Sequence, residues 1–384
     1  MRKILILCND LEIGGIQKSL IEFLNYLVPS QDFKVDLMLW QKDGPLQKMI
    51  PQEVNMIYQS YPSTITTLLN EKETLKKIPL FFQFLKSQYF TRVLKKPWLY
   101  YSKIPKQYDI AIAFTHNGFP RYFTIDHVSA SKKFLWFHHG SYHSARMEKK
   151  LDEKYFRQFD KIVTVSSANK AMLSMTFPNL KNMITVVPNI INSTEITRKA
   201  EALMEDMPHR SGWYNLVTVS RFSEEKGLDL AIQIAFELKR NGLPFKWYFI
   251  GDGDQFSAIR DLAIKMNVED VCVFKGIKEN PYPYIKRADL YIQSSYVEAH
   301  PITLIEALAL KKIIVTSDIP SVRELLQNGK LGILCKLEPC IFADEIVGIL
   351  GDEVQQKKLR TEIENYETSN KEACKAINLL LGIK

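Results

Sequence analysis

Glu298 and Glu306 are the carboxylates whose spacing and setting most clearly predict chemistry in this chain of 384 residues. The run Ala288–Ser294 alternates apolar side chains as a strand does, and Ile302–Leu310, after Pro301, contains helix-forming residues. We therefore expect Glu298 at the carboxyl end of a strand, where open α/β sheets bind ligands, and Glu306 about one turn into the following helix. The first turn of that helix favours an anion such as a pyrophosphate. The pair suits a ligand with both phosphates and hydroxyls, such as a nucleotide sugar, although a surface acid and a helix-capping acid would look the same.

Arg221 and Lys226 lie in the run Val219–Gly227, which follows the first predicted strand of the second half of the chain. An arginine and a lysine at a strand-to-helix turn can neutralise the charge that a departing diphosphate gains in a transition state. The alternative is a solvated, charged loop that opens a helix. The position of the turn, shortly before Glu298 in the same half, favours the first interpretation.

The first half of the chain offers a glycine pair and a histidine pair. Gly14 and Gly15 follow the first predicted strand, and such a loop lets backbone approach a phosphate, although a plain tight turn has the same sequence. His138 and His139 end the apolar run that begins at Phe134, so they are expected at the carboxyl edge of the sheet. His116 and His143 are weaker candidates, and the four histidines show no metal-ligand spacing.

The order of predicted elements indicates two doubly wound α/β halves, because strands alternate with helices along the whole chain. We expect an N-terminal Rossmann-like domain over 1–191, a polar linker over 192–212 and a second Rossmann-like domain over 213–365. An amphipathic helix, Lys371–Leu381, lies in the last segment, 366–384. The predicted strands are Lys3–Leu7, Lys34–Leu39, Ile110–Phe114, Lys133–Phe137, Lys161–Val165, Ile184–Val187, Asn215–Ser220, Lys246–Ile250, Val271–Phe274, Asp289–Ser294 and Lys312–Thr316.

The paired glutamates and the arginine, four residues, lysine and glycine pattern resemble signatures of family 4 retaining glycosyltransferases, which have the two-domain GT-B fold. The resemblance covers about residues 1–330 and is most specific in the second half. It implies a cleft between two facing domains, with the last helix returning to the first domain. Two departures stand out: His300 after the first glutamate, and Ser321 where a glycine is usual.

The resemblance also implies roles for the candidate residues. Glu298 would orient the donor sugar and Glu306 the ribose, while Arg221 and Lys226 would stabilise the diphosphate; His138 would be the catalytic-site histidine. The donor site would be completed by Gly15, Gly276, Ile302 and Thr303, and the acceptor side by Gly14, Gly15, His138 and His139. Ser166 and the run Val187–Asn189 match further family segments.

Asp252 and Asp254 form an Asp-x-Asp, which in the GT-A glycosyltransferase fold holds a divalent metal on the diphosphate. Here the two-domain pattern and the cations Arg221 and Lys226 already supply positive charge. We therefore expect no metal and no other cofactor, and interpret the Gly-Asp-Gly sequence as an ordinary strand-to-helix turn.

The net charge of +8 implies an acidic partner, but the basic residues follow no nucleic-acid-binding motif. Eight of them lie in the segment 76–106, without any acidic residue and interleaved with aromatics. This suits an anionic membrane surface, whereas the alternative is core aromatics beside solvated lysines. Five scattered cysteines and no long apolar run favour a cytoplasmic protein, peripheral on the inner face of the membrane.

We thus expect a retaining glycosyltransferase that moves a hexose or N-acetylhexosamine from a UDP- or GDP-sugar. The acceptor expected from the resemblance is a lipid-linked glycan in bacterial capsule, exopolysaccharide or lipopolysaccharide biosynthesis. The alternatives are a GT-B sugar-nucleotide epimerase and a non-catalytic subunit that binds a nucleotide sugar.

Overall fold

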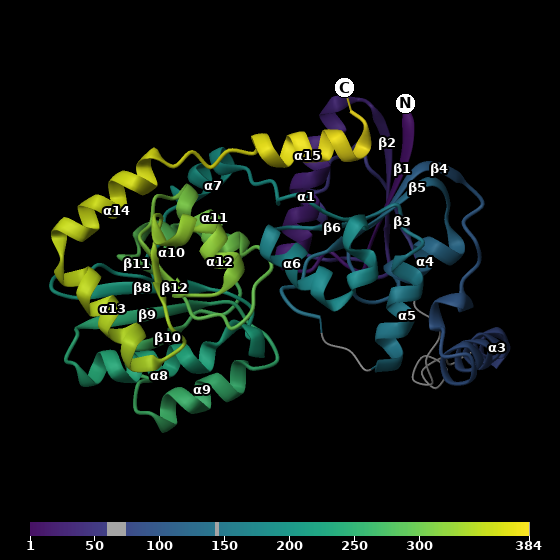
Figure 1. Cartoon of the computed structure of the whole chain (residues 1–384). Coiled ribbons are helices and arrows are strands. Elements are labelled where there is room, and N and C mark those ends of the chain that lie inside the picture. Colours follow the sequence, from purple (N-terminus) through teal and green to yellow (C-terminus); the bar gives the residue numbers. More distant parts are fainter. Residues whose placement is uncertain (60–73, 143–145, 384) are drawn as a thin grey trace.

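The computed structural model describes residues 1–59, 74–142 and 146–383, and it contains two parallel sheets side by side (Figure 1). Over these residues the first sheet has seven strands in the order β3-β2-β1-β4-β5-β6-β7 and the second has six in the order β10-β9-β8-β11-β12-β13. All pairings are parallel. The predicted fold class, two doubly wound Rossmann-like domains, is confirmed.

The strands of the first sheet are β1 (Arg2–Cys8), β2 (Phe33–Leu39), β3 (Asn55–Tyr58), β4 (Gln107–Ala113), β5 (Ser129–Phe137), β6 (Lys161–Thr164) and β7 (Ile184–Val186). Its helices are α1 (Gly15–Leu27), α3 (Thr74–Gln88), α4 (Pro120–His127), α5 (Arg146–Phe156) and α6 (Ser167–Thr176). Two short turns, η3 (Tyr89–Val93) and η4 (Pro97–Tyr100), follow α3.

The strands of the second sheet are β8 (Tyr214–Val219), β9 (Phe245–Ile250), β10 (Cys272–Phe274), β11 (Leu290–Gln293), β12 (Ile314–Ser317) and β13 (Ile333–Cys335). Its helices are α8 (Leu228–Arg240), α9 (Phe256–Lys265), α10 (Tyr282–Arg287), α11 (Ile302–Ala309), α12 (Pro320–Leu325), α13 (Pro339–Gly351) and α14 (Glu353–Asn365). The turn η6 (Glu224–Lys226) precedes α8. The edge strands β3 and β13 were not predicted, whereas the similarly short strands β7 and β10 were.

Strand β1 shows why these runs form central strands. Ile4 and Ile6 pack into the core on the α1 side of the sheet, whereas Leu5 and Leu7 pack into a separate core on the opposite side. Successive side chains of a strand point to opposite faces, so a strand that is covered on both faces must be apolar at every position. All four side chains are fully buried.

Two segments connect the domains. One is the stretch between the two sheets, and the other is the end of the chain. Helix α7 (Ser193–Ala200) lies within the predicted linker, and α15 (Lys371–Leu381) has the predicted bounds. Figure 1 shows α15 lying against the first domain, where Ile377 and Leu381 join its core and Arg2 donates a hydrogen bond to Leu381 O over 2.6 Å. The last helix therefore belongs to the core of the first domain.

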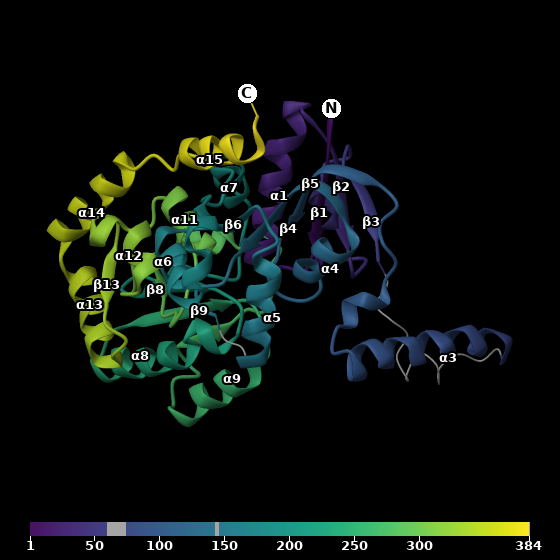
Figure 2. The ribbon, with the colours of Figure 1, turned by 45° about the vertical axis from the view of Figure 1, so that its right-hand side comes forward.

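The basic, aromatic segment 76–106 divides into two parts. Trp98 and Tyr101 are core residues: Trp98 stacks on Tyr122, with ring centroids 3.9 Å apart, and its Nε1 donates to Asp126. Helix α3, in contrast, projects from the first domain (Figures 1 and 2). The core alternative therefore holds for Trp98 and Tyr101, and the membrane surface stays a prediction for the rest of the segment. No helix among the described residues has the length and hydropathy to cross a membrane.

Candidate functional site

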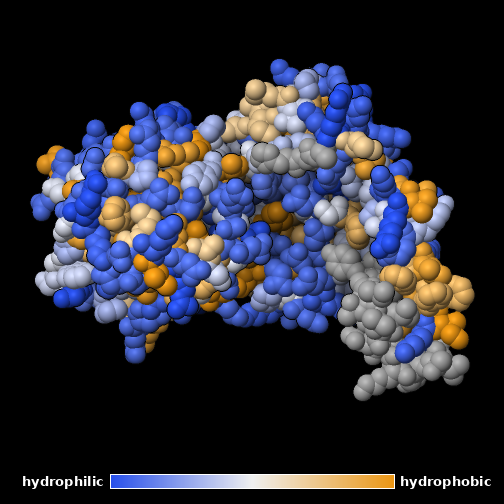
Figure 3. Space-filling view, turned by 90° about the horizontal axis from the view of Figure 1, so that it is seen from below, coloured by the Kyte–Doolittle hydropathy of each residue, from blue (hydrophilic) through white to orange (hydrophobic). Residues whose placement is uncertain are grey.

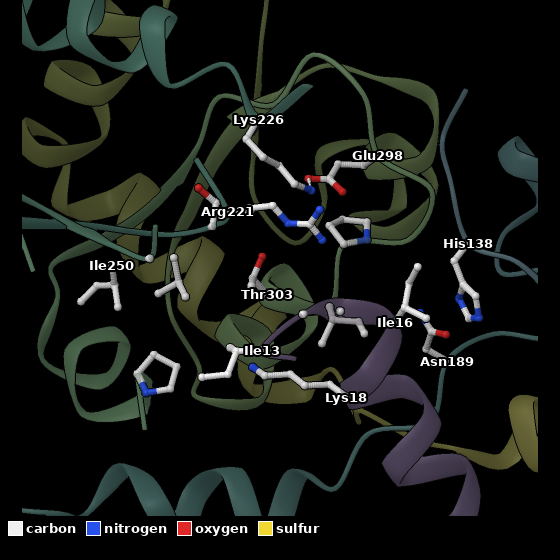
Figure 4. Close-up of a pocket in the computed structure, with 18 of the residues that line it drawn as sticks. Ile13, Ile16, Lys18, His138, Asn189, Arg221, Lys226, Ile250, Glu298 and Thr303 are labelled. Carbon is white, nitrogen blue, oxygen red and sulfur yellow. Dashed lines mark hydrogen bonds and ion pairs between the residues drawn. The ribbon is translucent and has the colours of Figure 1, made fainter. Parts of the chain in front are cut away.

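A cavity of about 560 Å³ lies between the two domains, a size typical of small-molecule sites. Its walls come from loops at the carboxyl ends of strands: Gly14 and Gly15 after β1, His138 after β5, Arg221 after β8 and Glu298 after β11. In the second sheet the two loops flank the point where the strand order reverses, between β8 and β11, which is where open α/β sheets bind ligands. In the first sheet the order reverses between β1 and β4, and the His138 loop follows β5, the next strand along. Figure 4 shows Arg221, Lys226 and Glu298 gathered on one side and His138 and Asn189 on the other.

The Glu298 carboxylate is held by three donors on one oxygen. Oε1 accepts from Lys226 Nζ at 2.7 Å, Gln293 Nε2 at 2.9 Å and Ser295 Oγ at 2.8 Å. The side chain is mostly buried, with 9% exposed, so the ion pair with Lys226 is shielded from solvent. Three donors on one oxygen of a mostly buried carboxylate fix its orientation.

The turn that carries Arg221 and Lys226 is anchored from below. Phe222, between them in the sequence, is buried in the core of the second domain. Gly227 closes the turn with φ +58, and a Cβ there would lie 2.2 Å from Ser294 O, so only glycine fits. Arg221 itself is exposed to the cavity, and an ideal Cβ on Gly14 would lie 3.7 Å from its Nη2. The turn thus presents a guanidinium to the opposite domain.

Two helices begin at the cavity and face each other across it. Helix α1 starts at Gly15 and α11 at Ile302, and an ideal Cβ on Gly15 would lie 3.7 Å from Ile302 Cδ1. The N-terminus of a helix carries a partial positive charge and free backbone N–H groups. With Arg221 and Lys226, these two termini make the cavity suitable for an anion with several oxygens.

Glu306 lies beneath the cavity and is bound from the other domain. Lys18 Nζ contacts Glu306 Oε1 at 2.6 Å, and Tyr282 Oη donates to the same atom at 3.0 Å. The Glu306 side chain is only 2% exposed, and its Oε2 is buried without a hydrogen-bond partner among the described residues. A buried carboxylate oxygen normally has a donor, so Oε2 retains an unmet capacity to accept a hydrogen bond.

Two candidate histidines of the first domain, His138 and His116, are in surroundings that lower their pKa. Burial lowers the pKa of His138 to about 3, and its Nε2 is buried without a hydrogen-bond partner among the described residues. Burial also holds the pKa of His116 well below its usual range, and this ring stacks on Phe137 rather than facing the cavity. His139 lines the cavity, and its Nδ1 lies 3.1 Å from Ser141 O. His143 lies outside the described residues.

Contacts across the cleft involve residues to which we assigned no role from the sequence. Asn189 Nδ2 lies 3.3 Å from His300 Nδ1, and burial lowers the pKa of His300 to about 4. Ser166 Oγ donates to Ala299 O over 2.6 Å. Lys18 was also missed, although it lies three residues after Gly15, where a helix turn brings it back to the cleft face.

Gly140 makes the tightest approach between the domains. An ideal Cβ at this position would lie 2.4 Å from the carbonyl carbon and oxygen of Glu298. The loop after β5 therefore rests directly on the backbone of the loop after β11, and a side chain would push them apart.

Asp252 and Asp254 sit in the turn after β9 and do not converge on a common point. Asp252 Oδ1 accepts from Gly253 N over 2.7 Å, and Asp254 is exposed. The described residues contain no group of three or more His, Cys, Asp or Glu side chains suited to a metal ion.

The structure brings most of the candidate residues to one cavity. Its lining includes Gly14, Gly15, His138, His139, Arg221, Lys226, Glu298, Ile302 and Thr303. Glu306 does not line the cavity; it lies behind the wall and is in contact with Lys18, which does line it. Gly276 is next to the wall, which Ile277 forms, and its carbonyl accepts from Gly251 N over 2.9 Å.

The second domain and its flanking residues match a known protein family. Residues 199–368, less than half of the chain, match the family described as glycosyl transferases group 1. An uncharacterized glycosyltransferase of Methanocaldococcus jannaschii is 26% identical over 200 residues, which are 48% of this chain and 49% of the relative.

Two bacterial relatives have more specific names. The amylovoran biosynthesis glycosyltransferase AmsK of Erwinia amylovora is 29% identical over 127 residues, 31% of each chain. An N-acetylgalactosamine-N,N'-diacetylbacillosaminyl-diphospho-undecaprenol 4-alpha-N-acetylgalactosaminyltransferase of Campylobacter jejuni is 26% identical over 180 residues, 47% of each chain. The matches thus span about half or less of these relatives.

Among solved structures, HepE of Anabaena in complex with UDP and glucose matches the whole length. The TM-score is 0.72 at 15% identity, over 100% of this chain and 98% of HepE. The chain therefore has the GT-B fold.

Proposed function

We propose that this protein is a retaining glycosyltransferase that uses a nucleotide-diphosphate sugar. The observation that carries the proposal is the interdomain cavity in which Arg221, Lys226 and two helix N-termini surround the space beside Glu298. Such a site suits a diphosphate next to a hydroxylated ring. The match to the group 1 glycosyltransferase family and the bacterial relatives support the same activity.

In the proposed reaction, the bond between the sugar C1 and the diphosphate oxygen breaks as the acceptor hydroxyl oxygen bonds to C1 on the same face. The acceptor proton passes to the departing diphosphate oxygen. Arg221 and Lys226 stabilise the charge that the diphosphate gains, and the helix termini add fixed dipoles. This arrangement supplies positive charge without a metal.

Glu298 is proposed to orient sugar hydroxyls rather than to remove a proton. Its Oε1 already accepts three hydrogen bonds, one of them from the Lys226 ammonium, so this oxygen is engaged by donors of the protein. The neutral His138 faces the same space from the first domain and can exchange hydrogen bonds with the transferred sugar. No step of the proposal needs a further base.

The ribose is proposed to approach Glu306, whose buried Oε2 has room for one more donor. Gly276 would then border the base, next to the wall formed by Ile277. We propose UDP or GDP as the nucleotide and a hexose or N-acetylhexosamine as the sugar.

For the acceptor we propose a lipid-linked glycan in bacterial capsule, exopolysaccharide or lipopolysaccharide biosynthesis. The name of the Campylobacter relative specifies a diphospho-undecaprenol acceptor, and the Erwinia relative is named for amylovoran biosynthesis. Such an acceptor would bring the protein to the inner face of the cytoplasmic membrane.

The test is incubation of the purified protein with a panel of UDP- and GDP-sugars, with and without detergent-solubilised lipid-linked glycan. Transfer predicts nucleotide release that depends on the acceptor, and NMR of the product should show the anomeric configuration of the donor. Recovery of an isomerised donor would identify an epimerase, and tight binding without turnover would identify a binding subunit. An inverted product would overturn the retaining mechanism.

A further inference from the structure

The surface outside the cavity that is least expected for a soluble fold is the α3 arm, which we define as residues 77–96. It comprises most of α3, the turn η3 and the two lysines that follow. Figures 1 and 2 show α3 projecting away from the rest of the first domain. Its main contacts are with η3 and η4, the next two turns of its own chain segment.

The outward face of the arm is apolar. Ile78, Phe81, Phe82, Leu85 and Tyr89 follow a spacing of three and four residues, which places them on one face of a helix, and all five are exposed. Phe82 has 65% of its surface exposed, and Val93 and Leu94 extend the face along η3. Seven of the 18 large hydrophobic side chains that are exposed among the described residues thus lie within 78–94. Figure 3 shows hydrophobic surface gathered at this end of the first domain.

Such a face is normally turned toward the core. In α3 the residues on the other side, Phe84 and Ser87, are the ones turned inward. Single exposed apolar residues are ordinary, whereas a contiguous stripe marks a surface that another apolar phase covers.

The positive charge of the arm indicates which kind of apolar surface covers the stripe. The segment 74–106 has eight of the 51 Lys and Arg residues and no Asp or Glu, which leaves 43 basic and 43 acidic residues in the rest of the chain. The net charge of +8 is therefore equal to the charge of this one segment. Lys86, Arg92 and Lys95 are exposed beside the apolar stripe.

An apolar helical face flanked by cations, with aromatic side chains, suits the interface of a bilayer with anionic lipids. A second copy of the chain fits poorly, because two arms in contact would bring like charges together. The segment that follows the arm is anchored in the first domain: Trp98 Nε1 and Tyr155 Oη both donate to Asp126 Oδ2, at 2.8 Å and 2.6 Å.

We infer that the α3 arm is the membrane-docking element of this protein and that its occupant is an anionic lipid surface. The stripe from Ile78 to Tyr89 enters the headgroup boundary, and Lys86, Arg92 and Lys95 contact lipid phosphates. This deepens the proposed function, since it would place the first domain next to a lipid-linked acceptor, but lipid binding itself requires no turnover.

The experiment is sedimentation with vesicles of phosphatidylcholine alone and with about 30% phosphatidylglycerol. We expect binding to the anionic vesicles, weakening as salt rises because exposed charges are screened over about 8 Å at physiological ionic strength. The triple variant Phe81→Gln, Phe82→Gln, Leu85→Gln should weaken binding at least about tenfold, and so should Lys86→Gln, Arg92→Gln, Lys95→Gln.

Matched controls change equally exposed residues elsewhere. Ile264→Gln, Val354→Gln, Leu379→Gln removes three exposed apolar side chains, and Lys357→Gln, Lys358→Gln, Lys375→Gln removes three exposed charges. Both controls should bind vesicles like the parent. Nucleotide release with a soluble acceptor should be equal in all variants, which separates docking from transfer.

The inference is overturned if the parent ignores anionic vesicles or if the arm variants bind as well as the controls. It is also overturned if the arm variants abolish a dimer seen by sedimentation equilibrium while vesicle binding is unchanged, since the stripe would then cover a second copy. Absence of turnover with every donor would leave the vesicle result valid and would count only against the proposed transfer.

Discussion

The two domains bring different chemistry to the same cavity. The second domain contributes charged side chains on short, anchored turns: Arg221, Lys226 and Glu298. The first domain contributes glycines and the neutral His138, with Lys18 as a charged residue that is already paired to Glu306. Ionic chemistry is concentrated on the side that would hold the diphosphate, whereas the opposite side supplies shape and neutral hydrogen bonds.

This asymmetry explains why the motifs of the second domain were easier to recognise. A diphosphate requires cations at fixed spacing, which leaves a pattern in the sequence. A neutral wall that admits an acceptor can be built from many residues, so it leaves a weaker pattern. The family match begins at residue 199 and covers only the second domain and its flanks.

The difference between the two domains predicts that the largest loss of activity follows from changes in the turn that carries Arg221 and Lys226. Arg221→Ala and Lys226→Ala should each lower kcat/KM by about 10²-fold or more, because each removes a charge that acts on the developing diphosphate. Steady-state kinetics with the identified donor measures this. Lys239→Ala, at an exposed pair with Asp270, is the control and should keep its rate. Near-parent rates in both cavity variants would refute the assignment of the charged turn.

The next largest loss of activity is expected where the loop of the first domain that carries Gly140 approaches the second domain. Gly140→Ala places a Cβ against the Glu298 carbonyl, so the two loops must separate. Misplacement of this kind should lower kcat/KM by about 10-fold to 100-fold, with the fold intact by circular dichroism. Gly348→Ala, in α13 with nothing within 4 Å of the new Cβ, should have no effect. Equal activity of both variants would show that the contact is not needed.

Lys18 is a charged residue that the first domain contributes to the cavity, and its variant tests whether its ion pair with Glu306 matters for donor binding. Lys18→Met leaves the buried Glu306 with Tyr282 alone, and we expect KM for the donor to rise about tenfold with kcat little changed, because ground-state and transition-state binding are lost together. A double-mutant cycle with Glu306→Gln should be non-additive, since the two side chains are in contact. Lys34→Met, at an exposed position, is the control. Additive effects would mean that the pair does not act as a unit.

The neutrality of His138 predicts a pH effect on stability. Its folded pKa of about 3 is below the unfolded value near 6.5, so the unfolded state binds the extra proton first and stability falls as pH drops from about 6.5 toward 3. His138→Gln should therefore lose less stability between pH 7 and pH 5, by up to about 2 kcal/mol in urea unfolding. His209→Gln is the control. A parallel loss in parent and variant would contradict a neutral His138.

The smallest effect is expected at the Asp-x-Asp turn. Because Arg221 and Lys226 supply the positive charge, activity should survive excess EDTA, and Asp254→Asn should change kcat/KM by less than about twofold. Asp252→Asn is the paired variant, since Asp252 lines the cavity and its Oδ1 accepts from Gly253 N. Activity lost in EDTA and restored by Mn²⁺ would show that the charge is not supplied by the protein alone.

Much of this molecule could be predicted from local sequence. Strands that are buried on both faces are continuous apolar runs, so β1, β5 and β11 were predicted within a few residues, and the bounds of α15 were matched. Residues that follow such strands must lie at the carboxyl edge, which is why Gly14, His138, Arg221 and Glu298 could be placed at the cleft before the structure was known.

The tertiary structure decided the contacts between distant segments. Lys18 and Glu306 are 288 residues apart, and no local periodicity relates two charges on different domains. The tertiary structure also decided that Trp98 and Tyr101 are core residues whereas the stripe of α3 is exposed. The two stretches have the same basic and aromatic composition, so their sequences do not distinguish them. Local pattern reports which residues are apolar or charged, whereas burial depends on what the rest of the chain brings against them.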